Sequence, residues 1–256
     1  FATHVLIPEG QNNADQFFHS KSKDREEELA QARKSHKSGN VNASAKTKAA
    51  ATNRLTAVIL DVGEDFLGAS TPLLQLARML KAQGHCVHYF AESNLRERVQ
   101  AIGVKYHAYS SSSGSSEWNH NEAAVQQCKE FNCPSESLEK ALPSSKMLLT
   151  SVSLLNGGLA EHVQALKPDM VLCDAFFPAG SLVSEIIGVP CVTSCSSHFF
   201  GREERDRIMG FLRDLDYNQE SCTLLEKKYG ISYDAADTFC NYSDYTICWT
   251  VPQFDT

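Results

Sequence analysis

The chain has 256 residues, of which 42% are hydrophobic and 9% aromatic, with only 14 glycines and 8 prolines. This composition excludes collagen-like, coiled-coil and wholly disordered proteins, and the length allows one large domain or two small ones. The formal net charge of −7 is unevenly spread, because residues 1–54 hold nine Lys/Arg against six Asp/Glu and the remainder is acidic. An acidic body without a basic stripe disfavours nucleic-acid binding, since phosphate neutralisation needs clustered cations.

All nine cysteines lie beyond residue 85, and several fall inside apolar, strand-like runs, as Cys173 does. Reduced cysteine acts there as a small buried hydrophobe, which favours a reducing compartment and a cytoplasmic protein. The closely spaced pairs that begin at Cys128 and Cys191 lack the second pair that zinc sites use, so we expect no metal site. No apolar run approaches the roughly 20 residues that span a bilayer, and no signal-peptide core is present, so we expect a soluble protein without a membrane span.

The first part of the chain differs sharply from the rest. Residues 11–54 carry Lys, Ser, Asn and Ala in place of spaced apolar residues, so burial cannot offset the entropy lost on ordering. We therefore predict a disordered polar tail over residues 1–54 and one folded domain over residues 55–256.

In the predicted domain, strand and helix patterns alternate. After a first strand over residues 56–62, Thr71 and Pro72 are typical of an N-cap and a first helical residue, and Gly84 ends that helix. A serine-rich loop over residues 110–116 and an irregular stretch around Trp118 follow the strand predicted over residues 104–109. Further strands are predicted over residues 86–90, 104–109, 168–174, 190–194 and 245–250, and helices over residues 93–102, 146–166 with a break at 157–158, 178–187 and 206–229. This alternation predicts an α/β fold, a Rossmann-like parallel sheet flanked by helices.

Ligands of an open parallel sheet bind beyond the carboxyl ends of its strands. Asp174 ends one predicted strand, where a carboxylate either caps the following turn or serves in function. His198 follows the next strand, and the loop over residues 63–70 follows the first. That loop matches neither the dinucleotide-binding nor the Walker pattern, so the sequence does not predict a phosphate site there.

Two motifs carry a resemblance to a known family. The run Gly-Ala-Ser-Thr-Pro-Leu-Leu-Gln-Leu-Ala at 68–77, followed by Gln-Gly-His-Cys-Val at 83–87, resembles the opening motif of the UDP-glycosyltransferase superfamily (family 1, GT-B fold). The run Pro-Asp-Met-Val-Leu-Cys-Asp-Ala-Phe at 168–176, with Ile-Gly-Val-Pro at 187–190, is similar to the second signature of its N-terminal domain. The resemblance implies the N-terminal, acceptor-binding half of a GT-B glycosyltransferase, without the C-terminal donor domain.

The family pairs a His, which deprotonates the acceptor hydroxyl, with an Asp that orients and charges it. Asp174 falls on the Asp position, but Ala69 stands where the family has its His, and alanine accepts no proton. His198, Glu64 or Asp65 are the open alternatives for a substitute base. The resemblance implies Asp174 as a catalytic residue, and we predict His198 as a second one. We expect acceptor contacts from the residues near the predicted cleft, which are Phe66, Gly68, Phe176, Phe177, Ser196 and Phe199.

The implied family role is transfer of a sugar from a UDP-sugar to a hydroxyl of a small lipophilic acceptor, with inversion. We expect this chain to bind no cofactor and to be inactive alone, with UDP-sugar serving as co-substrate only when a donor-domain polypeptide is supplied. Ala69 and the lacking donor domain leave two alternatives open: a catalytically inactive acceptor-binding module, or one half of a split glycosyltransferase.

Overall fold

The computed structural model describes residues 4–6, 54–63, 67–109, 119–133, 146–196, 201–243 and 245–249. The chain divides into two units, one of residues 1–6 with 54–256 and the other of residues 7–53, which lie outside the described residues. In the described part, no helix combines the length and the apolar character that crossing a membrane requires.

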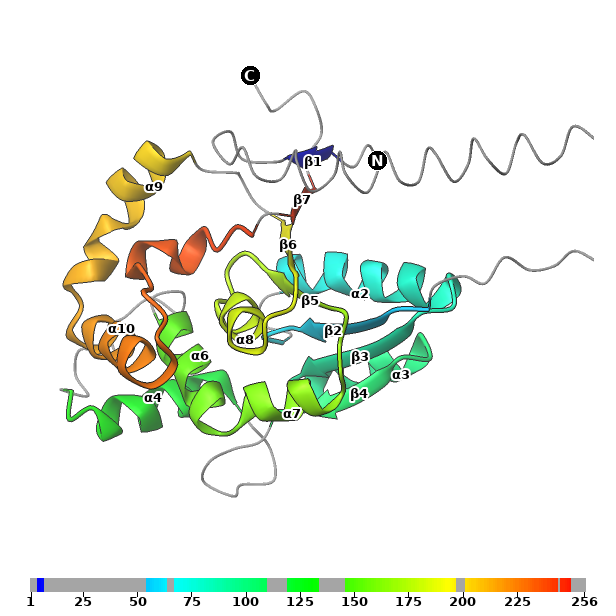
Figure 1. Ribbon diagram of the computed structural model, residues 1–256, viewed down its shortest axis with the longest axis horizontal. Coiled ribbons are helices and arrows are strands. Elements are labelled where there is room, and N and C mark those ends of the chain that lie inside the picture. Colours follow the sequence, from blue (N-terminus) through cyan, green and yellow to red (C-terminus); the bar gives the residue numbers. More distant parts are fainter. Residues whose placement is uncertain are drawn as a thin grey trace, which may run out of the picture. The chain divides into compact units, whose positions relative to one another are not determined.

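A seven-stranded sheet forms the centre of the larger unit, counted over the described residues (Figure 1). Its order is β1-β7-β6-β5-β2-β3-β4, and every neighbouring pair is parallel except β1 and β7. The strands are β1 His4–Leu6, β2 Thr56–Leu60, β3 Cys86–Ala91, β4 Lys105–Ala108, β5 Met170–Asp174, β6 Cys191–Cys195 and β7 Tyr245–Cys248. The six parallel strands have the order of a doubly wound Rossmann-type sheet, as the sequence predicts.

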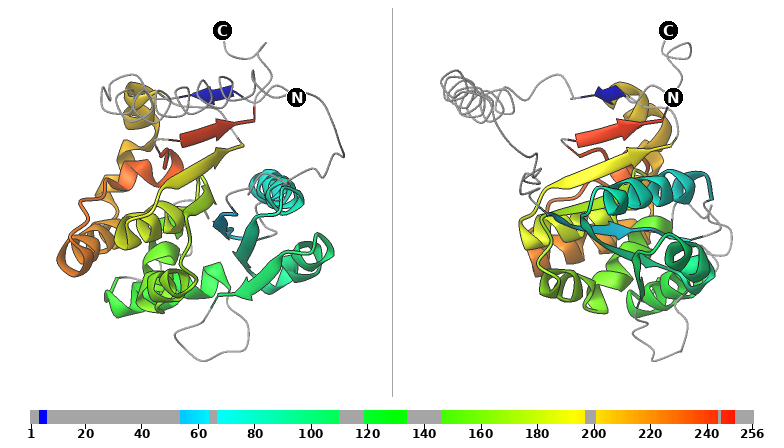
Figure 2. Two further views of the ribbon diagram at one scale, coloured as in Figure 1. Left: turned by 45° about the vertical axis from the view of Figure 1, so that its right-hand side comes forward. Right: turned by 90° about the vertical axis from the view of Figure 1, so that its right-hand side faces the viewer.

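Helices cover both faces of this sheet (Figures 1 and 2). Val58 and Leu60 pack under α6, α7 and α8, whereas Ala57 and Ile59 pack under α2 and α3, because successive strand residues point to opposite faces. The helices are α2 Leu67–Ala82, α3 Arg96–Ala101, α4 His120–Glu130, α6 Met147–Asn156, α7 Leu159–Ala165, α8 Ala179–Ile187, α9 Arg202–Met209 and α10 Asp216–Tyr229, with 3₁₀ turns η2 Ser93–Leu95, η4 Gly210–Asp214 and η5 Ala235–Phe239.

The predicted tail is corrected at one point. Three of its residues, His4–Leu6, form the short strand β1, which pairs antiparallel with β7 at the sheet edge. Backbone hydrogen bonds to an existing strand give even three residues a defined place. Most of the predicted tail, residues 7–53, falls outside the described residues, so its predicted disorder stays a prediction.

Three helical regions also differ from the prediction. Helix α2 begins at Leu67, before the predicted cap at Thr71, and Pro72 lies inside it, because Ser70 bonds back to Asp61 and Gly63 instead of leaving the chain extended. Helix α4 replaces the irregular stretch expected after Trp118, and the Asn119 side chain caps it by accepting two backbone N–H groups. The single helical region predicted over residues 206–229 divides into α9, η4 and α10.

Candidate functional site

Asp61 directly follows β2, where the strand order reverses between β2 and β5. Its carboxylate is 1% exposed and accepts three hydrogen bonds: from the Ser70 hydroxyl at 2.7 Å, the Gly63 N–H at 3.2 Å and the Tyr89 hydroxyl at 2.5 Å. Burial still outweighs these donors and raises the pKa of Asp61 from 3.8 to about 6. Buried ionisable groups with shifted pKa values cluster at functional sites, and Asp61 lies at the crevice where open parallel sheets bind ligands.

Asp174 ends β5, the strand next to β2 in the sheet. One carboxylate oxygen accepts the Phe176 N–H at 2.9 Å, which fixes the turn after the strand, and the other receives a longer contact of 3.4 Å from the Ser196 hydroxyl. Burial, with a smaller contribution from the negative charge of Asp61, raises the pKa of Asp174 from 3.8 to about 7. Asp174 can therefore gain or lose a proton near neutral pH, which suits acid–base chemistry.

A buried histidine–carboxylate pair lies at the same edge and was missed by the sequence analysis. Glu92 follows β3, and one of its oxygens accepts both the His120 backbone N–H at 2.9 Å and the His120 ring Nδ1–H at 2.8 Å. This assignment leaves Nε2 as the acceptor, and the Asn121 amide donates to it at 3.1 Å. The sequence signal was the cap Asn119, which marks the start of α4 and would have placed His120 at a helix N-terminus.

The Glu92 carboxylate also reaches the loop after β2. A Cβ atom added to Gly63 would lie 2.6 Å from Glu92 Oε2, and Gly63 has φ +127°, so only glycine fits this position. The His120 ring is 2% exposed and both of its nitrogens are engaged, so the pair is closed in this structure. The pair joins the end of β3 to the start of α4, and Glu92 packs against Gly63 in the loop after β2.

Comparisons with known proteins agree with this architecture. The structure of the glycosyltransferase of kitacinnamycin matches with a TM-score of 0.52 at 18% identity, covering 74% of this chain and 44% of that one. The calicheamicin glycosyltransferase CalG4 matches with a TM-score of 0.54 at 17% identity, covering 76% and 47%. The chain has the fold of the N-terminal half of a GT-B glycosyltransferase.

The likeness concerns the fold and covers part of each glycosyltransferase. At 17–18% identity it shows the fold alone, and the chain spans less than half of the length of either glycosyltransferase. No protein-family model matches the sequence, and no curated protein matches it.

In this GT-B half, some of the predicted site residues come together and others do not. Asp174 and Ser196 are in contact, Phe176 is half-buried beside them, and Gly68 is exposed in the first turn of α2. Ala69, which the resemblance aligns with the family's base, is 5% exposed in the same turn. The predicted residues Phe66, His198 and Phe199, like Glu64 and Asp65, lie outside the described residues.

Phe177 requires a correction. Its side chain is 0% exposed and packs in the core with residues of α6 and α8, so it offers no surface to an acceptor. The apolar side chain of Phe177, which favoured a pocket residue in the sequence, instead fills the space between helix and sheet. Over the described residues, no three His, Cys, Asp or Glu side chains come together to hold a metal ion.

Proposed function

We propose that this chain is the acceptor-binding part of a glycosyltransferase that moves a sugar from a UDP-sugar to a hydroxyl of a small lipophilic acceptor, with inversion. The single observation that supports this most is Asp174, a buried carboxyl group at the end of β5 whose pKa lies near neutrality, in the crevice of a GT-B half. Phe176, half-buried beside it, supports an apolar acceptor.

In the proposed reaction, the acceptor hydroxyl loses its proton and its oxygen attacks the anomeric carbon from the face opposite the nucleotide. The new C–O bond forms as the bond to UDP breaks, and UDP leaves with the electron pair, so the configuration inverts. Asp174 orients the base and carries the charge that stabilises it once protonated. Ala69 accepts no proton and the His120 ring is closed by Glu92 and Asn121, so the proposed base is His198, with Glu64 and Asp65 as the alternatives.

UDP-sugar is proposed as the co-substrate, held by a donor domain rather than by this chain. Partners that follow are the small acceptor and a polypeptide carrying that domain. Localisation in the cytoplasm is part of the same proposal and rests on the free thiols, because all nine cysteines are reduced in the structure.

A second candidate function is an inactive module that binds the acceptor without transferring sugar to it, or one half of a split enzyme. The observation that favours it is Ala69, which leaves the family's base position without a proton acceptor. Ligand-dependent thermal shifts without turnover by the chain, alone or with a donor-domain partner, would support the module.

The test is turnover of radiolabelled UDP-sugar with a panel of hydroxylated aromatic acceptors, measured with the chain and with any partner that copurifies with it. The Asp174→Asn variant is expected to lose at least about 100-fold in turnover. The matched control is Asp169→Asn at the other end of β5, where the carboxylate accepts only the Thr56 N–H in the described structure. Equal activity of both variants would remove Asp174 from the mechanism, and no turnover in any combination would refute transfer.

A further inference from the structure

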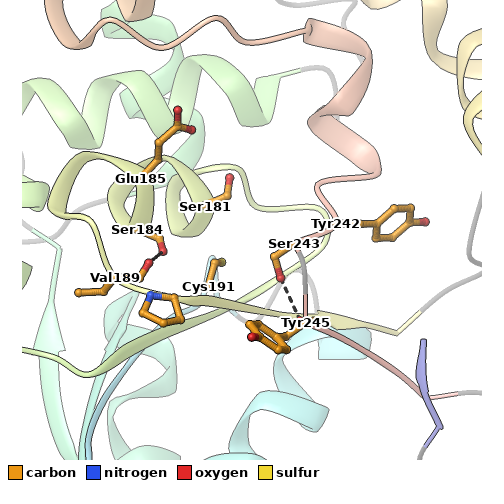
Figure 3. Close-up of a pocket in the computed structure, with 9 residues that line it drawn as sticks. Ser181, Ser184, Glu185, Val189, Cys191, Tyr242, Ser243 and Tyr245 are labelled. Carbon is orange, nitrogen blue, oxygen red and sulfur yellow. Dashed lines mark hydrogen bonds between the residues drawn. The ribbon is translucent and has the colours of Figure 1, made fainter. Parts of the chain in front are cut away.

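A pocket of about 440 Å³ opens at the amino ends of β6 and β7, the edge of the sheet opposite Asp174 (Figure 3). Ser184 and Glu185 of α8 line one side of it, and Tyr242 and Ser243 line another. Cys191, the first residue of β6, lies between them. The glycosyltransferase function proposed above uses no residue of this pocket.

The Cys191 thiol has a second thiol beside it. Its sulfur lies 3.8 Å from the sulfur of Cys173 on the neighbouring strand β5. In the sheet Cys191 pairs with Val171, and Cys173 is two residues further along β5. Cys173 is fully buried and packs against α8 so closely that a Cβ atom on Gly180 would lie 2.3 Å from its sulfur. Cys191 is half-buried, so the pocket gives solvent a route to Cys191 and leaves Cys173 behind it.

The two thiols share their protons unequally. The hydrogen bond between the two thiols lowers the pKa of Cys191, and the same hydrogen bond together with burial raises the pKa of Cys173. The nearby hydroxyl groups lower the pKa of Cys191 less than their number implies, because Ser184 already donates to the Val189 carbonyl and Ser243 to the Tyr245 carbonyl. The charged form therefore concentrates on Cys191, the thiol that the pocket exposes.

Other cysteines of the chain have the opposite character. Burial raises the pKa of Cys222 and of Cys240 to about 11, and the same cause with the neighbouring Cys128 does so for Cys133. A thiol reacts as its thiolate, so these groups are unreactive at neutral pH. Cys222 is half-buried like Cys191, which makes it an internal reference for accessibility.

We propose that Cys191 is a modification site, at which hydroperoxides and other small electrophiles enter the pocket and react with the thiol, and that Cys173 resolves the oxidised form to a disulfide. In the first step the Cys191 sulfur attacks a peroxide oxygen, the S–O bond forms, the O–O bond breaks, and the leaving oxygen takes a proton. In the second step the Cys173 sulfur attacks that of Cys191, the S–S bond forms, and the hydroxyl leaves as water after protonation. Two thiols are oxidised and one hydroperoxide is reduced.

The first experiment is alkylation of the folded chain with iodoacetamide at pH 7.5, followed by quantitative peptide mass spectrometry. Cys191 is expected to react at least tenfold faster than Cys222. Each unit by which the pKa of a thiol is lower raises its thiolate fraction about tenfold, and the weaker nucleophilicity of that thiolate offsets only part of the gain. Equal or slower labelling of Cys191 would overturn the proposal.

Two variants at one position separate the roles of Cys173. Cys173→Ser keeps a donor toward Cys191 and should retain fast alkylation, whereas Cys173→Ala removes the donor and should slow it about threefold or more. Unchanged labelling of Cys222 shows that each variant is folded, and fast labelling of Cys191 in Cys173→Ala would contradict the shared-proton geometry.

Hydrogen peroxide tests the second step. The unaltered chain is expected to yield a peptide linked through Cys173 and Cys191, and Cys173→Ser is expected to stop at a sulfenic acid on Cys191 that dimedone traps. Oxidation of Cys191 without a link to Cys173 would overturn the resolving role. None of these measurements involves sugar transfer, so their failure is distinct from failure of the proposed glycosyltransferase function.

Discussion

The two edges of the parallel sheet differ in chemistry although the same strands build both. At the carboxyl edge, Asp61 and Asp174 are buried carboxyl groups within hydrogen-bond networks. At the amino edge, Cys191 lies in an open pocket among hydroxyl groups. Buried charge costs stability whereas a thiol among hydroxyl groups costs little, so the electrostatic cost is concentrated at the edge where open parallel sheets bind ligands.

The largest effect is expected from Asp174→Asn. The pKa of Asp174 rises from 3.8 in the unfolded chain to about 7 in the folded one, so the folded state keeps a proton that the unfolded state has lost. The free energy of unfolding therefore falls as the pH rises between those values, and the whole cost is present above pH 7. Removing the charge should stabilise the protein by as much as about 4 kcal/mol at pH 8 and by nothing near pH 3.

Urea denaturation of the variant at both pH values measures this difference. The control is Asp169→Asn, an exposed position just before the same strand, where a surface substitution should change the free energy of unfolding by no more than about 0.5 kcal/mol. If Asp174→Asn destabilises the protein at pH 8, the carboxyl edge does not carry the electrostatic cost assigned to it.

Gly180 tests the packing between the two edges. A methyl group there would lie 2.2 Å from Cys173 Cβ, so Gly180→Ala should destabilise the protein by about 3 kcal/mol or more through overpacking. The control is Gly68→Ala, where no atom lies within 4 Å of the added carbon and helix propensity predicts a gain of about 0.5–1 kcal/mol. Thermal unfolding compares the two variants, and equal midpoints would contradict the tight contact between α8 and β5.

The hydrogen-bond network of Asp61 predicts a smaller loss. Tyr89→Phe removes a donor from a buried carboxylate and should cost about 2 kcal/mol. Tyr106→Phe is the matched control on the neighbouring strand, because that hydroxyl donates to the neutral carbonyl of Ala91 and its loss should cost about 1 kcal/mol. A smaller loss for Tyr89→Phe than for Tyr106→Phe, measured by denaturant midpoints, would show that Asp61 does not depend on this donor.

A histidine pair joins β3 and β4, where His88 Nδ1 and His107 Nε2 lie 2.8 Å apart. Burial, with smaller contributions from the positive charges of His88, His162 and Lys105, lowers the pKa of His107 from 6.5 to about 4. The unfolded chain then holds the extra proton, so the stability contributed by His107 rises with pH from about 4 to 6.5, opposite to Asp174. His107→Gln should flatten this limb of the stability–pH curve, and an unchanged slope would refute the assignment.

The sequence predicts the layers of this fold well for a physical reason. Continuous apolar runs and glycine helix ends act locally, so the core strands and Gly188 at the end of α8 follow from neighbouring residues. Asp174 was found in the same way, as a carboxylate at the end of an apolar run.

The parts of the site that the sequence did not predict depend on contacts between residues far apart in the chain. Asp61 receives its donors from Ser70 and Tyr89, nine and 28 residues away, and no local pattern links them. Glu92 and His120 are likewise 28 residues apart. Phe177 was misassigned because the same apolar side chain suits a core and a pocket, and only its packing distinguishes the two.

The strand β1 has a practical consequence for handling the protein. Without His4–Leu6, β7 would become the last strand of the sheet and present a row of unpaired N–H and C=O groups. Such an edge is a template on which a strand of another molecule can add, and the pairing then extends from molecule to molecule. A shortened chain that starts at Arg54 should therefore lose colloidal stability before it loses its fold, as light scattering at rising concentration would record.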